Sequence, residues 1–98
     1  MRLRLGSRAL EDIADIRDYL LPRSSQGAEN VRRAIIEDFD LLEQFPHSGR
    51  STDIPGIRVL PVVRYPYLIY HTVNDGAGEI VIVHIRHSSR NAPAANDF

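Results

Sequence analysis

The 98-residue chain contains no cysteine and no lysine. Without cysteine there is no disulfide framework and no thiolate metal site, which is consistent with a reducing compartment. Without lysine, every mechanism that needs a lysine acid, base or Schiff base is excluded, and all twelve basic residues are arginines. The sequence also has no glycine-rich phosphate loop and no HExxH pattern, which argues against nucleotide-binding and zinc-protease chemistry.

Long apolar runs are absent as well. No stretch approaches the roughly 18 residues that a membrane span needs, and the first residues (MRLRLGSR) lack the apolar core of a signal peptide. We therefore expect a cytoplasmic protein that does not contact a membrane. The hydrophobic content of 43% and the charged content of 26% are those of an ordinary globular chain, which predicts a single domain over residues 1–98.

The two halves of the chain differ in charge. Residues 1–49 hold nine acidic residues and seven arginines, whereas residues 50–98 hold four acidic residues, five arginines and three of the four histidines. The first half is typical of solvated helix faces. The second half can form a mildly cationic surface.

Two helices are expected in the first half, after a short strand at residues 2–5 (RLRL). Ser7 can cap the first helix, and Pro22 ends it. The second helix should run from about residue 24 to Phe45, before Pro46. The expected buried stripe of the first helix is Leu10, Ile13, Ala14, Arg17, Leu20 and Leu21, with Glu11, Asp12, Asp15 and Asp18 opposite. The expected stripe of the second is Ala28, Val31, Ile35, Phe39, Leu42 and Phe45.

The second half reads as strands, because residues 57–63, 67–73 and 79–87 are rich in β-branched and aromatic side chains. The glycine-containing segment 74–78 predicts a hairpin between the last two, and Pro61 predicts an edge strand or a bulge. The order β-α-α-β-β-β indicates an α+β fold, with a mainly antiparallel sheet and a helical hairpin on one face. The other sheet face is then left for function.

The stretch HIRHSSR, residues 84–90, carries the main candidates for chemistry. A metal site with His71, His84 and His87 is disfavoured, because residues 84 and 87 point to opposite faces of a strand. A nucleophile at Ser88 or Ser89 lacks an orienting acid. The arginines of this half (Arg50, Arg58, Arg64, Arg86, Arg90) with His87 form either an anion-binding surface or separate solvated charges. Strand parity places Arg86 with Ile80, Ile82 and His84, and His87 with Val81, Val83 and Ile85.

Nearly the whole chain resembles the RelE/ParE superfamily of bacterial toxins, and most closely its ParE branch. The resemblance is carried by SRALEDIADIRDYL, LLEQFPHSGR, IRVLPV, RYPYLIYHTV and IVIVHIRHSSR. It implies the fold described above and the toxin role of a type II toxin–antitoxin (plasmid stabilisation) system. It further implies a ParD-like antitoxin encoded beside the gene, with which the toxin forms a hetero-oligomer.

The two branches imply different activities. The closing H-x-x-R, His87 to Arg90, resembles ParE proteins, which inhibit DNA gyrase by binding; this reading places target contacts on Arg86, His87 and Arg90 and needs no cofactor. RelE-like proteins instead cut ribosome-bound mRNA, and Arg58, Arg64 and His87 would be the catalytic candidates here. That set is incomplete, because lysine is absent and Ser88 follows His87 where a tyrosine would be expected. A non-toxic relative that only binds its antitoxin is the third possibility.

The antitoxin is expected to bind in two ways. Its tail would add a strand at the edge marked by Pro61 and lay a helix across the helical hairpin. Its acidic residues would then meet Arg58 and Arg64. This arrangement predicts that charge reversal at Arg58 or Arg64 weakens the complex more than reversal at Arg17 or Arg32.

Overall fold

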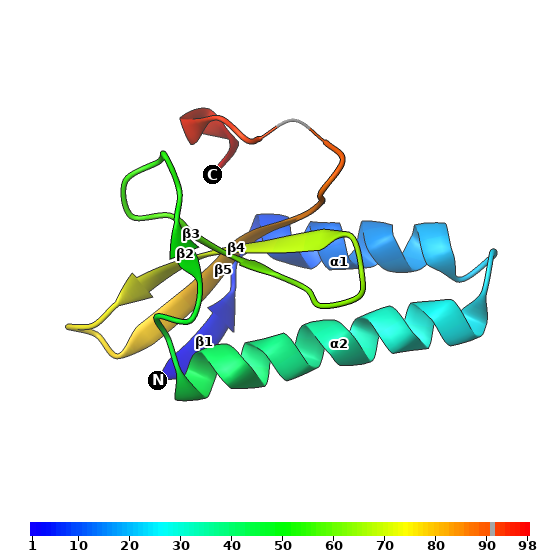
Figure 1. The fold of residues 1–98 in the computed structure, drawn as a ribbon, viewed down its shortest axis with the longest axis horizontal. Helices are drawn as coiled ribbons and strands as arrows, with labels where there is room; N and C mark the ends of the chain where they lie inside the picture. Colours follow the sequence, from blue (N-terminus) through cyan, green and yellow to red (C-terminus); the bar gives the residue numbers. More distant parts are fainter. Residues whose placement is uncertain (91) are drawn as a thin grey trace.

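The computed structural model describes residues 1–90 and 92–98. Its elements are β1 (Arg2–Leu5), α1 (Ser7–Leu20), α2 (Ser25–Gln44), β2 (Arg50–Ser51), β3 (Arg58–Pro61), β4 (Tyr67–Asn74), β5 (Glu79–His87) and the 3₁₀ turn η1 (Ala95–Asp97). The strands form one sheet in the order β1-β5-β4-β3-β2. The two helices pack on one face of this sheet, while η1 turns back over it on the side away from α2 (Figure 1). The α+β prediction is confirmed.

The N-cap residue of helix α1 lies one position earlier than the sequence predicts. The cap residue is Gly6, which makes no side-chain cap bond, and Ser7 is already helical. The reason is the tight passage of the chain beside β5. Gly6 N–H donates to the Ile82 carbonyl at 2.8 Å, and a Cβ on Gly6 would lie 3.1 Å from that same oxygen. The predicted Ser7 cap is therefore wrong.

The buried face of α1 is rotated from the expected one. Leu10 is exposed and Asp12 is buried, and Ala9, Ile13, Ile16 and Leu20 pack toward the core. The expected and the observed stripes share Ile13 and Leu20, so the apolar period alone did not separate them. What selects the observed face is a set of polar partners for Asp12 on β5, described below.

Helix α2 follows the prediction closely. The Ser24 hydroxyl accepts the Gly27 N–H at 2.9 Å, which satisfies one of the free amides of the first turn. Ala28, Val31, Ile35 and Leu42 are buried. Phe45 is an exception, because the helix has ended and its side chain is 60% exposed.

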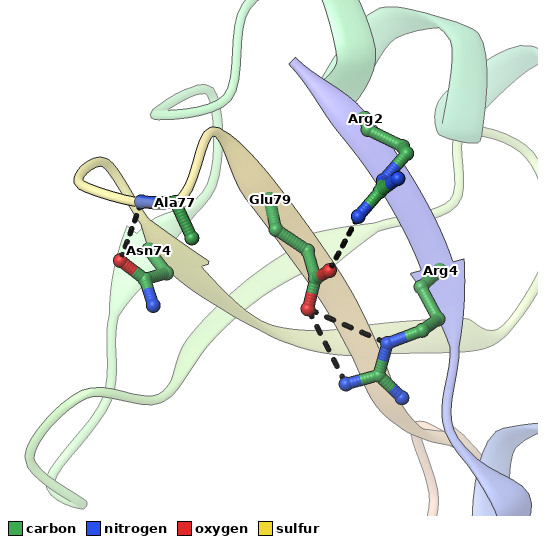
Figure 2. A network of polar contacts seen from close by, with 5 residues as sticks. All are labelled: Arg2, Arg4, Asn74, Ala77 and Glu79. Atoms are coloured by element: carbon green, nitrogen blue, oxygen red, sulfur yellow. Dashed lines mark hydrogen bonds and ion pairs between the residues drawn. The ribbon is translucent and has the colours of Figure 1, made fainter.

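The β4–β5 hairpin is confirmed as antiparallel, with Asn74 opposite Glu79 and Tyr67 opposite His87. Within its loop the Asn74 side chain accepts the Ala77 N–H at 3.1 Å. On the other side of β5, β1 pairs in parallel. Glu79 lies between the side chains of Arg2 and Arg4 and accepts from both (Figure 2). These exposed ion pairs fix the start of β1 but contribute little stability.

A bulge in β5 changes which side chains share a face. Tyr70 lies opposite His84 but His71 lies opposite Ile82, so Val83 is an additional residue in β5. Ile80, Ile82 and Ile85 therefore all join the core beneath the helices, and Val83 packs with Tyr70 on the other face. The predicted parity holds after the bulge, where Arg86 lies with His84 on the helix-free face and His87 lies on the side of Ile85. It is wrong across the bulge, because Ile80 and Ile82 lie on the opposite face from Arg86.

The edge predicted at Pro61 is only partly an edge. Strand β2 pairs with Val59 and Arg58, so β3 has a neighbour on that side. Leu60 and Pro61 lie beyond the two residues of β2. Pro61 pairs with Leu68 of β4 on one side and has no strand partner in β2 on the other side. This position suits proline, which has no amide proton to donate to a second strand.

Candidate target-binding surface

Arg86 organises the end of β5. Its Nε donates to the Tyr70 hydroxyl at 3.1 Å, and its Nη1 donates to the carbonyls of His87 (3.0 Å) and Arg90. The guanidinium also lies 5.6 Å from the centre of the Tyr70 ring. Arg86 thus holds residues 87–90, where the chain leaves β5, near the helix-free face of the sheet.

The turn before β4 lies beside this exit. Ser88 N–H donates to the Pro66 carbonyl at 2.8 Å, and the His87 and Tyr67 rings meet edge to face at 5.6 Å. Arg64 belongs to this turn. Its φ of 76° is left-handed, a conformation that costs a non-glycine residue about 1–3 kcal/mol and that recurs at functional sites.

We call Arg64, Arg86, His87 and Arg90 the cationic end of the sheet. Among residues 1–90 and 92–98, no carboxylate pairs with any of its three arginines. The arginines of the first half are different, because Arg8, Arg17, Arg32 and Arg33 pair with acids of that half, and Arg2 and Arg4 pair with Glu79 of β5. The cationic end therefore keeps its charge available for an external anion.

Arg58 does not belong to this group. Its Nη2 donates to the carbonyls of His47 (3.1 Å) and Gly49, so it holds the turn that precedes β2. It lies opposite His71, whereas His87 lies opposite Tyr67. Because His71 and Tyr67 are four residues apart on β4, the positions of Arg58 and His87 are about 13 Å apart along the strand direction. The three residues considered for RNA cleavage, Arg58, Arg64 and His87, do not converge on one point.

His87 is engaged within its own turn. Its Nδ1 accepts the Ser89 N–H at 3.1 Å and lies 2.7 Å from the Ser89 hydroxyl. This nitrogen therefore acts as a hydrogen-bond acceptor for the Ser89 amide. The contact fixes the ring orientation at the end of β5 and gives Ser89 a structural role.

A buried Asp12–His84 pair was missed by the sequence reasoning. Asp12 Oδ2 accepts from His84 Nδ1 at 2.6 Å and from the Ile85 N–H at 2.9 Å, and Oδ1 accepts from Arg8 at 3.3 Å. The Ile85 amide lies beyond the last β1–β5 pair, at Ile82. Asp12 therefore satisfies a strand edge that β1 leaves open, and it joins α1 to β5.

Burial shifts the pKa of two further groups, His71 and Asp38. Burial lowers the pKa of His71, and the nearby Arg58 charge acts in the same direction, against the opposing effect of the Ile69 carbonyl. Burial, assisted by Glu37, raises the pKa of Asp38 to about 6. Asp38 Oδ2 is buried without a hydrogen-bond partner among the described residues. Neither group lies in the cationic end.

An apolar concavity lies between the helices. It measures about 520 Å³ and is lined mainly by aliphatic side chains of α1 and α2, and Arg17, Glu29 and Arg32 also line it. Ile36 lines this interhelical groove and is 40% exposed. A groove of this kind suits the apolar face of a partner helix.

In the part of the chain that the structure describes, no group of three or more histidine, aspartate or glutamate side chains is arranged to hold a metal. No described helix is long and apolar enough to cross a membrane.

Known proteins share this architecture. A "Chromosomal ParDE TA system from P. aeruginosa" aligns with a TM-score of 0.77 and 27% identity, over 89% of this chain and 95% of that one. The isolated E. coli RelE toxin aligns with a TM-score of 0.61 over 92% of this chain and 86% of that one. At 14% identity it supports the fold alone. A helical hairpin on a five-stranded mixed sheet is thus the fold of RelE/ParE-superfamily toxins.

Sequence comparison defines the family more closely. Residues 3–92 match the ParE toxin of the type II toxin–antitoxin system parDE. Toxin RelE2 of Caulobacter vibrioides (strain ATCC 19089 / CIP 103742 / CB 15) is 37% identical over 83 residues, which are 85% of this chain and 90% of that protein. The chain belongs to the ParE family of type II toxin–antitoxin toxins, within the RelE/ParE superfamily.

Proposed function

We propose that this toxin inhibits DNA gyrase by binding to it through the cationic end, without chemistry of its own. The observation that carries the proposal is the set of unpaired arginines at one end of the sheet, in a chain whose other arginines mostly have carboxylate partners. Such a surface suits an acidic patch on a protein target. The left-handed Arg64 adds support, because backbone strain is retained where a side chain must be presented in one direction.

Cleavage of ribosome-bound mRNA is the second candidate, and the name of the 37% identical Toxin RelE2 favours it. Transfer of protons to and from a ribose hydroxyl and a leaving oxygen needs a base and an acid near one point. The separation of Arg58 from His87, and the contact of His87 with Ser89, weigh against such a site. We therefore place binding before cleavage.

Arg64→Gly separates function from folding. Glycine adopts a φ of 76° without strain, so the variant should be at least as stable as the parent while lacking the guanidinium. In a supercoiling assay with purified gyrase, the parent chain should inhibit, and Arg64→Gly and Arg90→Ala should each require about tenfold more protein. The control is Arg2→Ala. The Arg2 side chain is 80% exposed, and Arg2 lies on β1 opposite Glu79, at the end of β5 that is far from the cationic end.

The same preparations should be tested on ribosomes with mRNA. If the parent chain cuts the message and leaves supercoiling unchanged, RNA cleavage replaces the gyrase proposal. If it does neither, and also does not stop growth when expressed alone, the chain is an antitoxin-binding relative without toxicity.

We also propose that the antitoxin lays an amphipathic helix in the interhelical groove and sends acidic residues toward Arg64. The apolar groove on the helical hairpin and the positive charge at the cationic end, which has no carboxylate partner among the described residues, support this arrangement. Ile36→Glu places a charge in the groove at an exposed position, and Leu10→Glu is its control, because Leu10 is 54% exposed on α1 and does not line the groove. Only Ile36→Glu should weaken antitoxin binding.

Electrostatics of the same complex are tested by charge reversal. Arg64→Glu is expected to weaken antitoxin binding more than Arg32→Glu, since Arg32 already pairs with Glu29 at 2.7 Å. A larger effect of Arg32→Glu would place the main electrostatic contact on the helical hairpin.

A further inference from the structure

The helix-free face of the sheet carries an aromatic platform formed by Tyr70 and His84. The two rings are stacked, with centroids 6.0 Å apart and an interplanar angle of 26°. Both Tyr70 and His84 are buried. The platform lies beside the cationic end, since the Tyr70 hydroxyl accepts from Arg86.

Side-chain hydrogen bonds hold both rings of the platform in place. Asp12 holds the His84 ring at 2.6 Å, and Arg86 holds the Tyr70 hydroxyl at 3.1 Å. Neither contact involves residues 92–98, which we call the tail segment. The side-chain hydrogen bonds that hold the two rings therefore come from α1 and β5 and not from the tail segment.

In the structure the platform is covered by Phe98. The Phe98 ring lies 5.5 Å from Tyr70 and 6.1 Å from His84, nearly perpendicular to the latter at 77°. The tail segment reaches this position by turning back through η1 (Figure 1). These separations and tilts are those of favourable aromatic pairs.

Apart from these aromatic contacts, the tail segment has few contacts that hold it on the sheet. Within the tail segment, Ala94 and Asp97 bond to each other, with Ala94 N–H to Asp97 Oδ2 at 2.7 Å and Asp97 N–H to the Ala94 carbonyl at 3.0 Å. In the described part of the chain, no hydrogen bond or ion pair joins the tail segment to the sheet. Phe98 itself stays 37% exposed. The family match ends at residue 92, so residues 93–98 lie outside it.

We propose that the Tyr70–His84 platform is a docking site for an aromatic side chain that has an acidic neighbour, and that Phe98 is its resident, displaceable occupant. The occupant gives one part of the partner's chemistry, an aromatic ring for the platform. The arginines of the cationic end, which have no carboxylate partner among the described residues, give the other part, an acidic residue beside that ring. A partner peptide with this pattern competes with the tail segment. The proposal does not depend on whether gyrase is the target.

The test uses the full chain and a synthetic peptide with the sequence of residues 92–98, APAANDF. Binding is followed by NMR through the ring signals of Tyr70 and His84. In the parent chain the tail segment competes, so the peptide should bind the full-length Phe98→Ala chain about tenfold more tightly. Phe98→Tyr should behave as the parent, because an aromatic ring is retained. A peptide ending in alanine instead of phenylalanine should not bind.

Two controls keep the result interpretable. Phe45→Ala removes an exposed phenylalanine at the end of α2 and should leave peptide binding unchanged. The amide spectrum of Phe98→Ala should remain that of the folded parent outside the platform, since Phe98 lies outside both apolar clusters.

Three results would overturn the proposal. The first is an absence of peptide binding to Phe98→Ala, and the second is equal binding to Phe98→Ala and to the parent. The third is a concentration-dependent dimer of the parent that Phe98→Ala abolishes, because Phe98 would then occupy the platform of a second copy.

Discussion

Gly49→Ala should be among the most destabilising single-atom changes in the chain. Gly49 is buried in the turn between α2 and β2, where a Cβ would lie 2.7 Å from His71 Cε1 and 2.9 Å from the Val59 carbonyl oxygen. Neither neighbour can yield easily. The His71 ring is fully buried with Nδ1 at 3.2 Å from the Ile69 carbonyl, and Val59 is part of the three-stranded stretch β2-β3-β4.

The expected cost follows from these contacts. Overpacking of a close-packed interior costs about 1–3 kcal/mol, and two rigid neighbours put this site near 3 kcal/mol. For a domain of about 100 residues, that lowers Tm by roughly 15 °C. Thermal unfolding followed by circular dichroism measures the change directly.

Gly76→Ala is the matched control. Gly76 lies in the β4–β5 loop, has no left-handed φ, and a Cβ there would meet only Asn74 Oδ1 at 3.6 Å. Its Tm should change by no more than a few degrees. If Gly49→Ala unfolds at the same temperature as Gly76→Ala, the turn tolerates a side chain and the close-approach argument is wrong.

Three other changes test separate parts of the structure. Asp12→Ala leaves His84 and the Ile85 amide without their shared acceptor, so the free energy of unfolding should fall by about 2–4 kcal/mol in urea titration; a loss below 1 kcal/mol would mean that water replaces the carboxylate. Ser24→Ala removes the α2 cap and should cost about 1 kcal/mol, with unchanged circular dichroism at low temperature. Asp38 has its pKa raised to about 6, so the folded state holds this proton more tightly than the unfolded state, and the stability it confers is lost as pH rises from about 4 to 6. Because Asp38 is partly exposed, Asp38→Asn should stabilise the chain by only about 1–2 kcal/mol at pH 7, and the gain should disappear near pH 4; a gain of equal size at both pH values would contradict this cause.

Histidine titration is an independent check on the core. Burial and the Arg58 charge lower the pKa of His71, so its ring signal in NMR should titrate below the ordinary value of 6.5. Protonation then favours unfolding as pH falls below that value. A midpoint at or above 6.5 would mean that the ring is more hydrated than its burial implies.

Much of the fold could be predicted because its signals are local. The runs of β-branched and aromatic residues and the glycine-containing loop predicted the β4–β5 hairpin, and an apolar stripe that ends before Pro46 predicted α2. The change of period near residue 50 separated helices from strands. Each of these features depends on side chains only a few positions apart.

The remaining features depend on contacts between distant residues. The burial of Asp12 is explained by partners on β5, more than 70 positions away, and an α1 stripe containing Leu10 was equally consistent with the apolar period. The bulge at Val83 inserts one residue into β5, and no residue near it in the sequence predicts it. The bulge places Arg86 on the helix-free face instead of on the face of Ile80 and Ile82. The exclusion of Arg58 from the cationic end became visible only from the carbonyls it binds.

Expression of the chain without an antitoxin in a sensitive bacterial host tests the central claim most directly, when DNA-damage response and protein synthesis are recorded together. The account predicts that growth stops with induction of the DNA-damage response, that synthesis continues at first, and that Arg64→Gly, a folded variant, loses the effect. Arrest of synthesis with cleaved mRNA and no DNA-damage response, retained in Arg64→Gly, would contradict it.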